Sequence, residues 1–103
     1  MNIHIKTKYL DEPATLEFRH YNDGSTLIVA FSLTGEPLAT CTVAVVELPG
    51  EGYVFLKDWG ENEGIPECLV KAGIVELTGK KVRTGFCEAL EAKLLINVSA
   101  GQL

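Results

Sequence analysis

Apolar and polar residues alternate near the start of the chain. Residues 2–9 place Ile3 and Ile5 on one face, and residues 15–21 repeat the pattern after an Asp-Glu-Pro break at 11–13. A period of two is typical of a half-buried strand, because successive side chains point to opposite faces. The pattern therefore predicts two strands separated by that break.

Residues 26–33 form a nearly continuous apolar run after the Asn-Asp-Gly-Ser hairpin signal at 22–25. Such a run predicts a central strand, either covered on both faces or packed at an interface. Two more strands are predicted at 38–48 and 53–57, where Thr, Val and aromatic residues are frequent. The predicted core consists of apolar residues from these strands and the segments that follow: Leu27, Val29, Phe31, Val43, Val45, Val54, Leu56, Leu69 and Ile74.

The pattern changes to a helical period at residues 65–72. Pro66 suits the first turn of a helix, Asn62 is the predicted N-cap, and Gly73 is the predicted C-cap. A short strand is expected to start at Ile74 and Val75. A turn is expected next, at residues 78–81.

Residues 85–98 fit two structures. Glu88, Ala89, Leu90, Glu91 and Ala92 favour a helix by propensity, whereas the surrounding short strands favour a sheet. The whole chain is predicted to be a single α+β domain spanning residues 1–103. We expect a mostly antiparallel sheet of about six strands, with one short helix packed on one face.

Residues 24–95 resemble a family of short uncharacterised proteins from bacteria, phages and mobile elements. The most specific parts are the Lys-Asp-x-x-Glu-Asn-Glu-Gly run at 57–64 and the Gly-Phe pair at 85–86. The resemblance implies that the last segment is a strand, although residues 88–92 depart from the family's β-rich ending. It also implies a bacterial or phage origin and a cytoplasmic location, and it brings no activity.

Composition and charge narrow the function classes. The chain has 103 residues, 47% of them hydrophobic, and a net charge of −5, which argues against nucleic-acid binding. No apolar run is long enough for a membrane span, and the N-terminus lacks a signal-peptide pattern. Three cysteines, an odd number, are expected to be reduced thiols, so we predict a cytoplasmic protein.

An acidic segment surrounds the single tryptophan. We interpret it as a partner-binding patch, because Trp is favoured at interface hot spots. Helix capping with a solvated acidic face is the simpler alternative, and a divalent-cation site is a third whose spacing matches no known calcium loop. The predicted partner-binding residues are Asp58, Trp59, Glu61, Asn62, Glu63 and Glu67.

A basic cluster follows the helix. Lys80, Lys81 and Arg83 are the candidate anion-binding residues, and Gly79 would let a phosphate approach the backbone. With the helix N-terminus they define the alternative function, a small-ligand or nucleotide-binding module. The simpler interpretation is a solvated hairpin tip.

No catalytic constellation is predicted. Cys68 and His20 suggest a nucleophile and a base, but the carboxylates near Cys68 would raise its pKa. We therefore predict no catalytic residue, no metal and no cofactor. The predicted function is a non-enzymatic interaction protein that docks on an unknown protein partner, such as a host defence protein. A homodimer through the apolar run at 27–31 is a further expectation.

Overall fold

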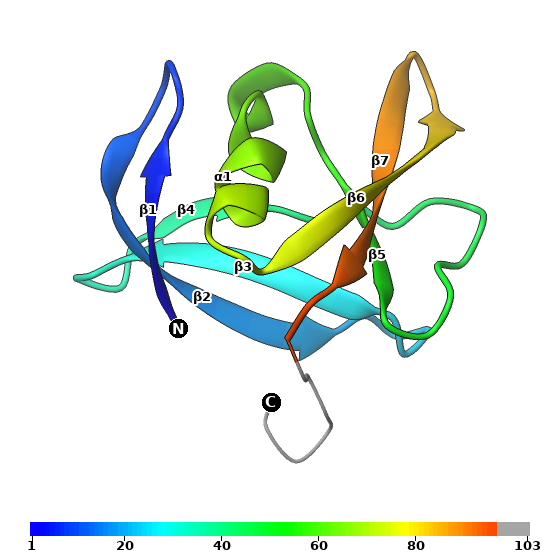
Figure 1. Cartoon of the computed structure of the whole chain (residues 1–103), viewed down its shortest axis with the longest axis horizontal. Coiled ribbons are helices and arrows are strands. Elements are labelled where there is room, and N and C mark those ends of the chain that lie inside the picture. The colour runs from blue at the N-terminus through cyan, green and yellow to red at the C-terminus, as the bar shows by residue number, and fades with distance from the viewer. Residues whose placement is uncertain (97–103) are drawn as a thin grey trace.

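The computed structural model describes residues 1–96 of the chain, which fold into seven antiparallel strands and one short helix. The strands form two sheets rather than one (Figure 1). The α+β prediction is confirmed, with one strand more than expected. No helix among the described residues is long and apolar enough to span a membrane.

The first sheet has the strand order β1-β2-β3-β4. Its strands are β1 (Asn2–Lys6), β2 (Asp11–His20), β3 (Thr26–Ser32) and β4 (Pro37–Thr40). The break predicted at 11–13 is absent, because these residues, including Pro13, belong to β2. Pro13 is tolerated because the hydrogen bond that it cannot donate would fall beyond the end of β3.

The register of β2 on β3 decides which face of β3 is inside. Phe18 pairs with Ile28 and Leu16 pairs with Ala30, so these residues share the inner face. Ile28 and Ala30 are fully buried. The prediction that Leu27, Val29 and Phe31 belong to the core is wrong: these three lie half-exposed on the outer face.

The second sheet has the order β5-β7-β6. It contains β5 (Tyr53–Leu56), β6 (Val75–Thr84) and β7 (Cys87–Leu94). Within the ambiguous segment at 85–98, Cys87–Leu94 thus form a strand, and residues 97 and 98 lie outside the described residues. Gly85, with a positive φ of 62°, starts the two-residue turn between β6 and β7, as a type II′ hairpin requires.

The two sheets are joined after β4, where the predicted strand at 38–48 is wrong in its length. The chain leaves the first sheet and bonds to β5: Lys57 N donates to Cys41 O at 3.0 Å, and Val43 N donates to Phe55 O at 2.9 Å. Thr42 and Leu56 face each other in an isolated bridge. Ladder pairing thus ends near residue 43. Val43 and Val45 are only half-buried, so the prediction that they belong to the core is wrong.

The helix α1 (Ile65–Lys71) follows a 3-10 turn, η1 (Gly60–Asn62). Its N-cap is Gly64, in the left-handed region, so the prediction of Asn62 as N-cap is wrong. Asn62 belongs to η1 instead. At the other end the C-cap is Ala72, so the predicted C-cap Gly73 lies one residue further on. The positive φ of Gly73 allows Ile74 N to donate to Leu69 O, which closes the helix as a Schellman motif.

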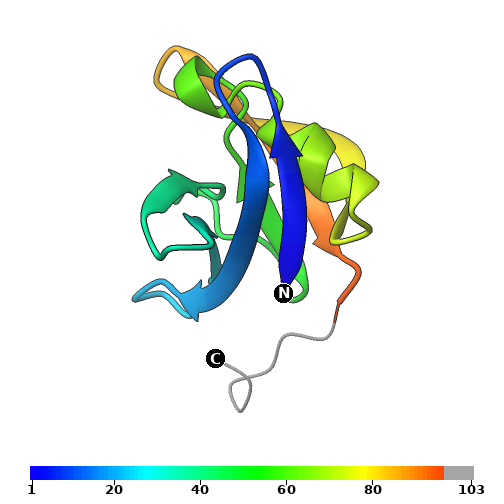
Figure 2. The same cartoon turned by 90° about the vertical axis from the view of Figure 1, so that its left-hand side faces the viewer.

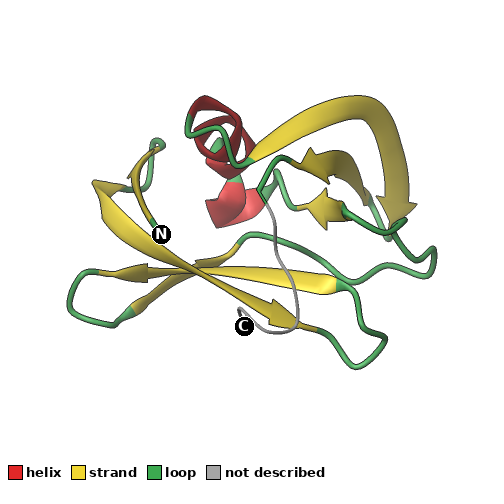
Figure 3. Cartoon of the chain, turned by 60° about the horizontal axis from the view of Figure 1, so that its bottom comes forward, coloured by secondary structure: helices red, strands yellow, loops and turns green. Residues whose placement is uncertain are grey.

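The core lies between the first sheet and the layer formed by α1 and the second sheet. Both lie on the same side of the first sheet (Figure 3), and α1 lies beside β1 (Figure 2). The predicted core residues Val54, Leu56, Leu69 and Ile74 are buried there. Figure 1 shows β1 and β6 on opposite sides of α1, so the helix separates two free strand edges.

Candidate functional site

Two residues of the predicted acidic patch shape the loop before α1. Asp58 Oδ1 accepts a hydrogen bond from Gly64 N at 2.9 Å, which holds the turn that leads into the helix. Asn62 Nδ2 donates to Thr40 O at 2.7 Å and ties the loop to β4. Both side chains therefore hold the loop in place, and neither caps the helix, because α1 has no side-chain cap hydrogen bond. Asp58 remains exposed.

Glu63 forms an ion pair with Lys8, with Oε2 and Nζ 2.8 Å apart. The hydrogen bond and charge of Glu63 raise the pKa of the Lys8 ammonium group. Both side chains are more than half exposed, so the pair contributes little to stability. Its role is to connect the β1–β2 turn to the start of α1.

The other three predicted residues differ in burial and in the element that carries them. Trp59 is half-buried, while Glu61 is exposed on η1. Glu67 is exposed on α1 and lines a groove beside β1. Asp58 lines a different concavity, beside β6, so Asp58 and Glu67 do not share a pocket.

The basic residues lie on a strand and not on a turn. β6 continues through them, and the pairing register with β7 shifts between Leu77 and Lys81, which marks a β-bulge. The local turn signal is real, because Lys80 N donates to Thr78 Oγ1 at 3.2 Å and Gly79 has a φ of 91°. Pairing with β7 on both sides of the bulge makes the segment one strand.

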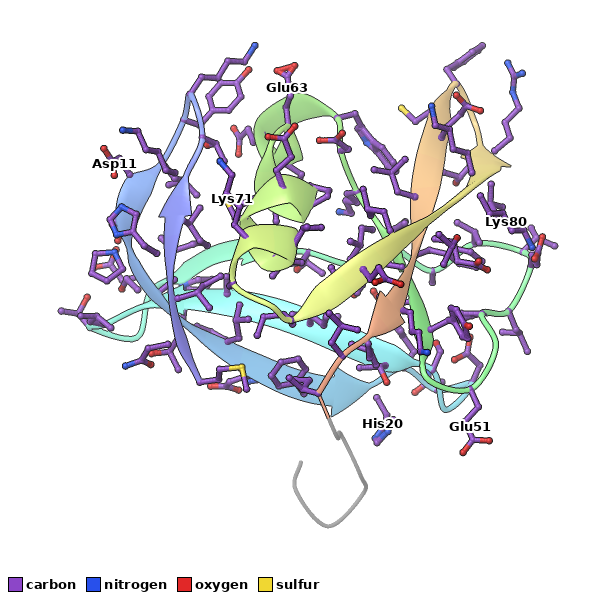
Figure 4. The ribbon with its side chains drawn as sticks, viewed as in Figure 1. Asp11, His20, Glu51, Glu63, Lys71 and Lys80 are labelled. Atoms are coloured by element: carbon purple, nitrogen blue, oxygen red, sulfur yellow. The ribbon has the colours of Figure 1, made fainter. Side chains whose placement is uncertain are left out.

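Lys80 is engaged with acidic side chains. Its Nζ pairs with Glu47 and lies 4.0 Å from Glu91 Oε2, and Figure 4 shows it beside the loop that precedes β5. The hydrogen bond with Glu47 raises the pKa of Lys80. Lys81 and Arg83 are exposed and form no ion pair within residues 1–96.

The acidic and basic candidates meet in one concavity of about 240 Å³, which we call the β6 pocket. It is lined by Asp58, Leu77, Gly79, Lys80, Lys81, Leu90 and Glu91. The sequence analysis missed Leu77, Leu90 and Glu91. The signal that could have found Leu77 is a large apolar residue directly before a polar Thr-Gly-Lys-Lys run, which places it at the rim of a charged surface.

Cys41 and Cys68 are buried thiols. Burial raises the pKa of Cys41 to about 12, so its reactive thiolate form is scarce at neutral pH. Cys68 is nearly buried and its Sγ donates to Lys6 O at 3.4 Å. His20 is exposed at the end of β2 away from α1 (Figure 4), so the Cys68–His20 pair does not assemble.

A metal site also finds no support among the described residues. Within residues 1–96, no group of three or more His, Cys, Asp and Glu side chains is arranged to hold a metal ion. The acidic residues that suggested a cation site are used separately, Asp58 in the loop and Glu63 with Lys8.

The comparisons with known proteins bring no relative to this site. No protein-family model, no curated protein and no solved structure matches the chain. The resemblance at residues 24–95 stays a prediction, and the functional argument rests on the geometry described above.

Proposed function

We propose that this protein is a non-enzymatic interaction domain that docks on a partner protein through the β6 pocket and the adjoining acidic segment. The observation that carries the proposal is the convergence of Asp58 with Lys80 and Lys81 around the exposed side chain of Leu77. Leu77, Lys80 and Lys81 belong to β6, and Asp58 comes from the loop after β5, so two separate segments meet on one concave surface.

The composition of this surface resembles that of protein interfaces. Protein interfaces combine an apolar centre with a polar rim, and here Leu77 and Leu90 are surrounded by charges of both signs. Phe86 is fully exposed at the tip of the same β6–β7 hairpin. Its large apolar side chain extends the contact area, and aromatic residues are enriched at interfaces.

The size of the pocket favours a protein over a small ligand. Pockets that enclose small ligands usually measure roughly 300–1,000 Å³. The β6 pocket, at about 240 Å³, is smaller and suits a single side chain of a partner. Lys80 is already paired with two carboxylates, so an anionic ligand would have to compete with them.

The charge of the chain bears on the kind of partner. With a net charge of −5, and with Asp58 and Glu61 exposed, the protein complements a basic protein surface. A host protein with a basic groove, such as a nuclease of a defence system, is the partner class that we infer. In a bacterial or phage setting, docking there would block the groove.

A photo-crosslinking residue placed at Leu77 tests the proposal. We expect one dominant partner from bacterial lysate, whose affinity is then measured with purified proteins. Leu77→Ser should weaken binding at least tenfold. The matched control is Val70→Ser on α1, because Val70 is 40% exposed and Leu77 is 41% exposed. Equal loss with both variants would reject the β6 pocket as the docking site.

Two rival proposals have their own tests. A nucleotide that raises the melting temperature of the wild type, but not of Lys80→Gln, would favour the small-ligand module. The homodimer would use the outer face of β3, where Leu27, Val29 and Phe31 are half-exposed. Light scattering that shows a monomer at high micromolar concentration would reject it.

A further inference from the structure

A groove of about 420 Å³ runs between β1 and α1, on the other side of the helix from the β6 pocket. Figure 2 shows the two elements side by side. We call it the β1 groove. Its main lining residues are Asn2, His4 and Lys6 from β1, and Glu67, Cys68 and Lys71 from α1.

The wall formed by β1 is a free strand edge. Leu16 N donates to Met1 O at 2.7 Å, and the register of β1 on β2 continues from that pair. In an antiparallel ladder only alternate residues bond to the partner strand, so Asn2, His4 and Lys6 point their backbone groups away from β2. These groups face the β1 groove.

One of these backbone groups already has a partner on the helix. Cys68 Sγ donates to Lys6 O at 3.4 Å, which closes the groove at that end. No described residue pairs with the amide or carbonyl groups of Asn2 and His4. Two residues of β1 therefore offer two donors and two acceptors to an added strand.

We propose that the β1 groove binds an extended peptide segment of a partner protein, which adds to β1 as a further strand and carries an acidic side chain. Strand addition uses backbone hydrogen bonds for affinity and neighbouring pockets for selectivity. The proposal concerns a site separate from the β6 pocket and goes beyond the function proposed above.

The charges of the groove favour an acidic side chain on the bound peptide. Lys6 and Lys71 are exposed, and neither has an ion-pair partner within residues 1–96. Glu67 is the single carboxylate among the lining residues, beside the ammonium groups of Lys6 and Lys71. Asp11, whose pKa is lowered by its hydrogen bond with His4 and by the charge of Lys6, is not among the lining residues. Figure 4 shows Lys71 on the side of α1 near β1. An Asp or Glu of the peptide would balance this charge.

The same charges disfavour a second copy of this chain in the groove. An antiparallel pairing of two β1 edges centred on His4 places the uncharged Asn2 of the second copy opposite Lys6, so the second copy supplies no carboxylate there. The groove floor includes Ile74, which is buried, so an alternate side chain of the peptide can be apolar. An extended segment with acidic and apolar residues fits both features.

The test selects binders from a displayed library of random heptapeptides on the immobilised full chain. The best heptapeptide is synthesised with blocked ends, and its affinity is measured by fluorescence anisotropy. Two variants of the heptapeptide carry backbone N-methyl groups, one at its odd-numbered and one at its even-numbered residues. One variant should bind at least tenfold more weakly, and the other should change in affinity less than threefold, because its methylated amides face away from β1. A library without binders, or an equal loss of affinity in both variants, would overturn the proposal.

Protein variants test the assignment to β1. His4→Pro removes the free-edge amide and should weaken binding about tenfold, whereas His4→Ala keeps the amide and should bind as the wild type does. The double variant Lys6→Gln, Lys71→Gln should bind an acidic heptapeptide about fivefold more weakly than the wild type does. Its affinity for the Glu→Gln analogue of that peptide should be unchanged. If His4→Pro fails to fold, the N-methylation series on the unmodified protein still decides.

Two controls distinguish the β1 groove from the β6 pocket, and a bound peptide from a second copy of this chain. Leu77→Ser should bind the heptapeptide as the wild type does, so failure of the β6 pocket proposal leaves this result untouched. A dimer in light scattering that the heptapeptide does not dissociate, and that His4→Pro abolishes, would show a second copy in the groove and overturn the peptide assignment.

Discussion

Gly64, the N-cap of α1, lies directly against Thr7 in the β1–β2 turn. A Cβ atom at position 64 would be 3.2 Å from Thr7 Cγ2 and 3.4 Å from Thr7 Cβ. The same glycine has a φ of 91° and gives its amide to Asp58. One residue thus determines both the start of the helix and its distance from β1.

Gly64→Ala should destabilise the protein by two separable effects. The left-handed backbone costs an L-residue about 1–2 kcal/mol, and the added methyl group must displace Thr7 at a cost of about 1 kcal/mol or more. Urea unfolding measures the sum. Gly35→Ala is the control, because Gly35 has the same φ of 91° and nothing within 4 Å of its Cβ position. If the two variants lose equal stability, Thr7 does not confine position 64.

Thr42 is the buried polar side chain where the two sheets join. Its Oγ1 accepts a hydrogen bond from Ile28 N at 3.2 Å and lies 3.0 Å from the Tyr21 hydroxyl. Thr42→Val keeps the shape but leaves the buried Ile28 amide without an acceptor, which should cost about 1–3 kcal/mol. Thermal unfolding checks this loss.

Tyr21→Phe is the companion of Thr42→Val. It removes one partner of the Thr42 hydroxyl and leaves the Ile28 amide bonded, so we expect a loss of about 1 kcal/mol. The double variant should lose less than the sum of the two single losses, because both changes remove the same hydrogen bond. Strict additivity would show that the two hydroxyls do not interact.

Cys41 makes stability fall at alkaline pH. Burial raises its pKa from 9.0 to about 12, so the folded protein keeps a proton that the unfolded chain loses. This contribution is fully present below pH 9 and is lost as the pH rises towards 12, by up to about 1.4 kcal/mol per pH unit. Cys41→Ala should flatten that part of the curve of unfolding free energy against pH.

Thiol labelling of the native protein gives an independent check on the cysteines. Cys87 is half-buried at the β6–β7 turn, while Cys41 is fully buried. Iodoacetamide at pH 8 should therefore modify Cys87 first and Cys41 last, as peptide mass spectrometry would show. Early modification of Cys41 would mean that its surroundings open readily.

Local signals predicted the helix well and the strands less well. Pro66 and Gly73 mark the two ends of α1 correctly, because each acts through its own backbone. The segment at 87–94 has helical propensity but forms the central strand of the second sheet, paired with β5 and β6. Pairing on both edges overrides a preference of a few tenths of a kcal/mol per residue.

The candidate site could be predicted only in part. The charges of Asp58, Lys80 and Lys81 are visible in the sequence, but their meeting in one pocket depends on how β6 pairs with β7 beside the loop. The free edge of β1 follows from the strand order, which the alternation at residues 2–9 does not contain. Long-range pairing is the information that local patterns lack.

The orientation of β3 gives the sharpest comparison of sequence and structure. Residues 27–31 are all apolar, so the sequence cannot say which face is inside, and the choice is made by the pairing of Phe18 and Leu16 with Ile28 and Ala30. Ile28→Ala should therefore cost about 2–5 kcal/mol, as expected for a fully buried side chain. Val29→Ala, on the half-exposed face, should cost less than about 1 kcal/mol. Urea unfolding of the two variants decides, since a larger loss for Val29→Ala would place Leu27, Val29 and Phe31 in the core and shift the register of β2 on β3 by one residue.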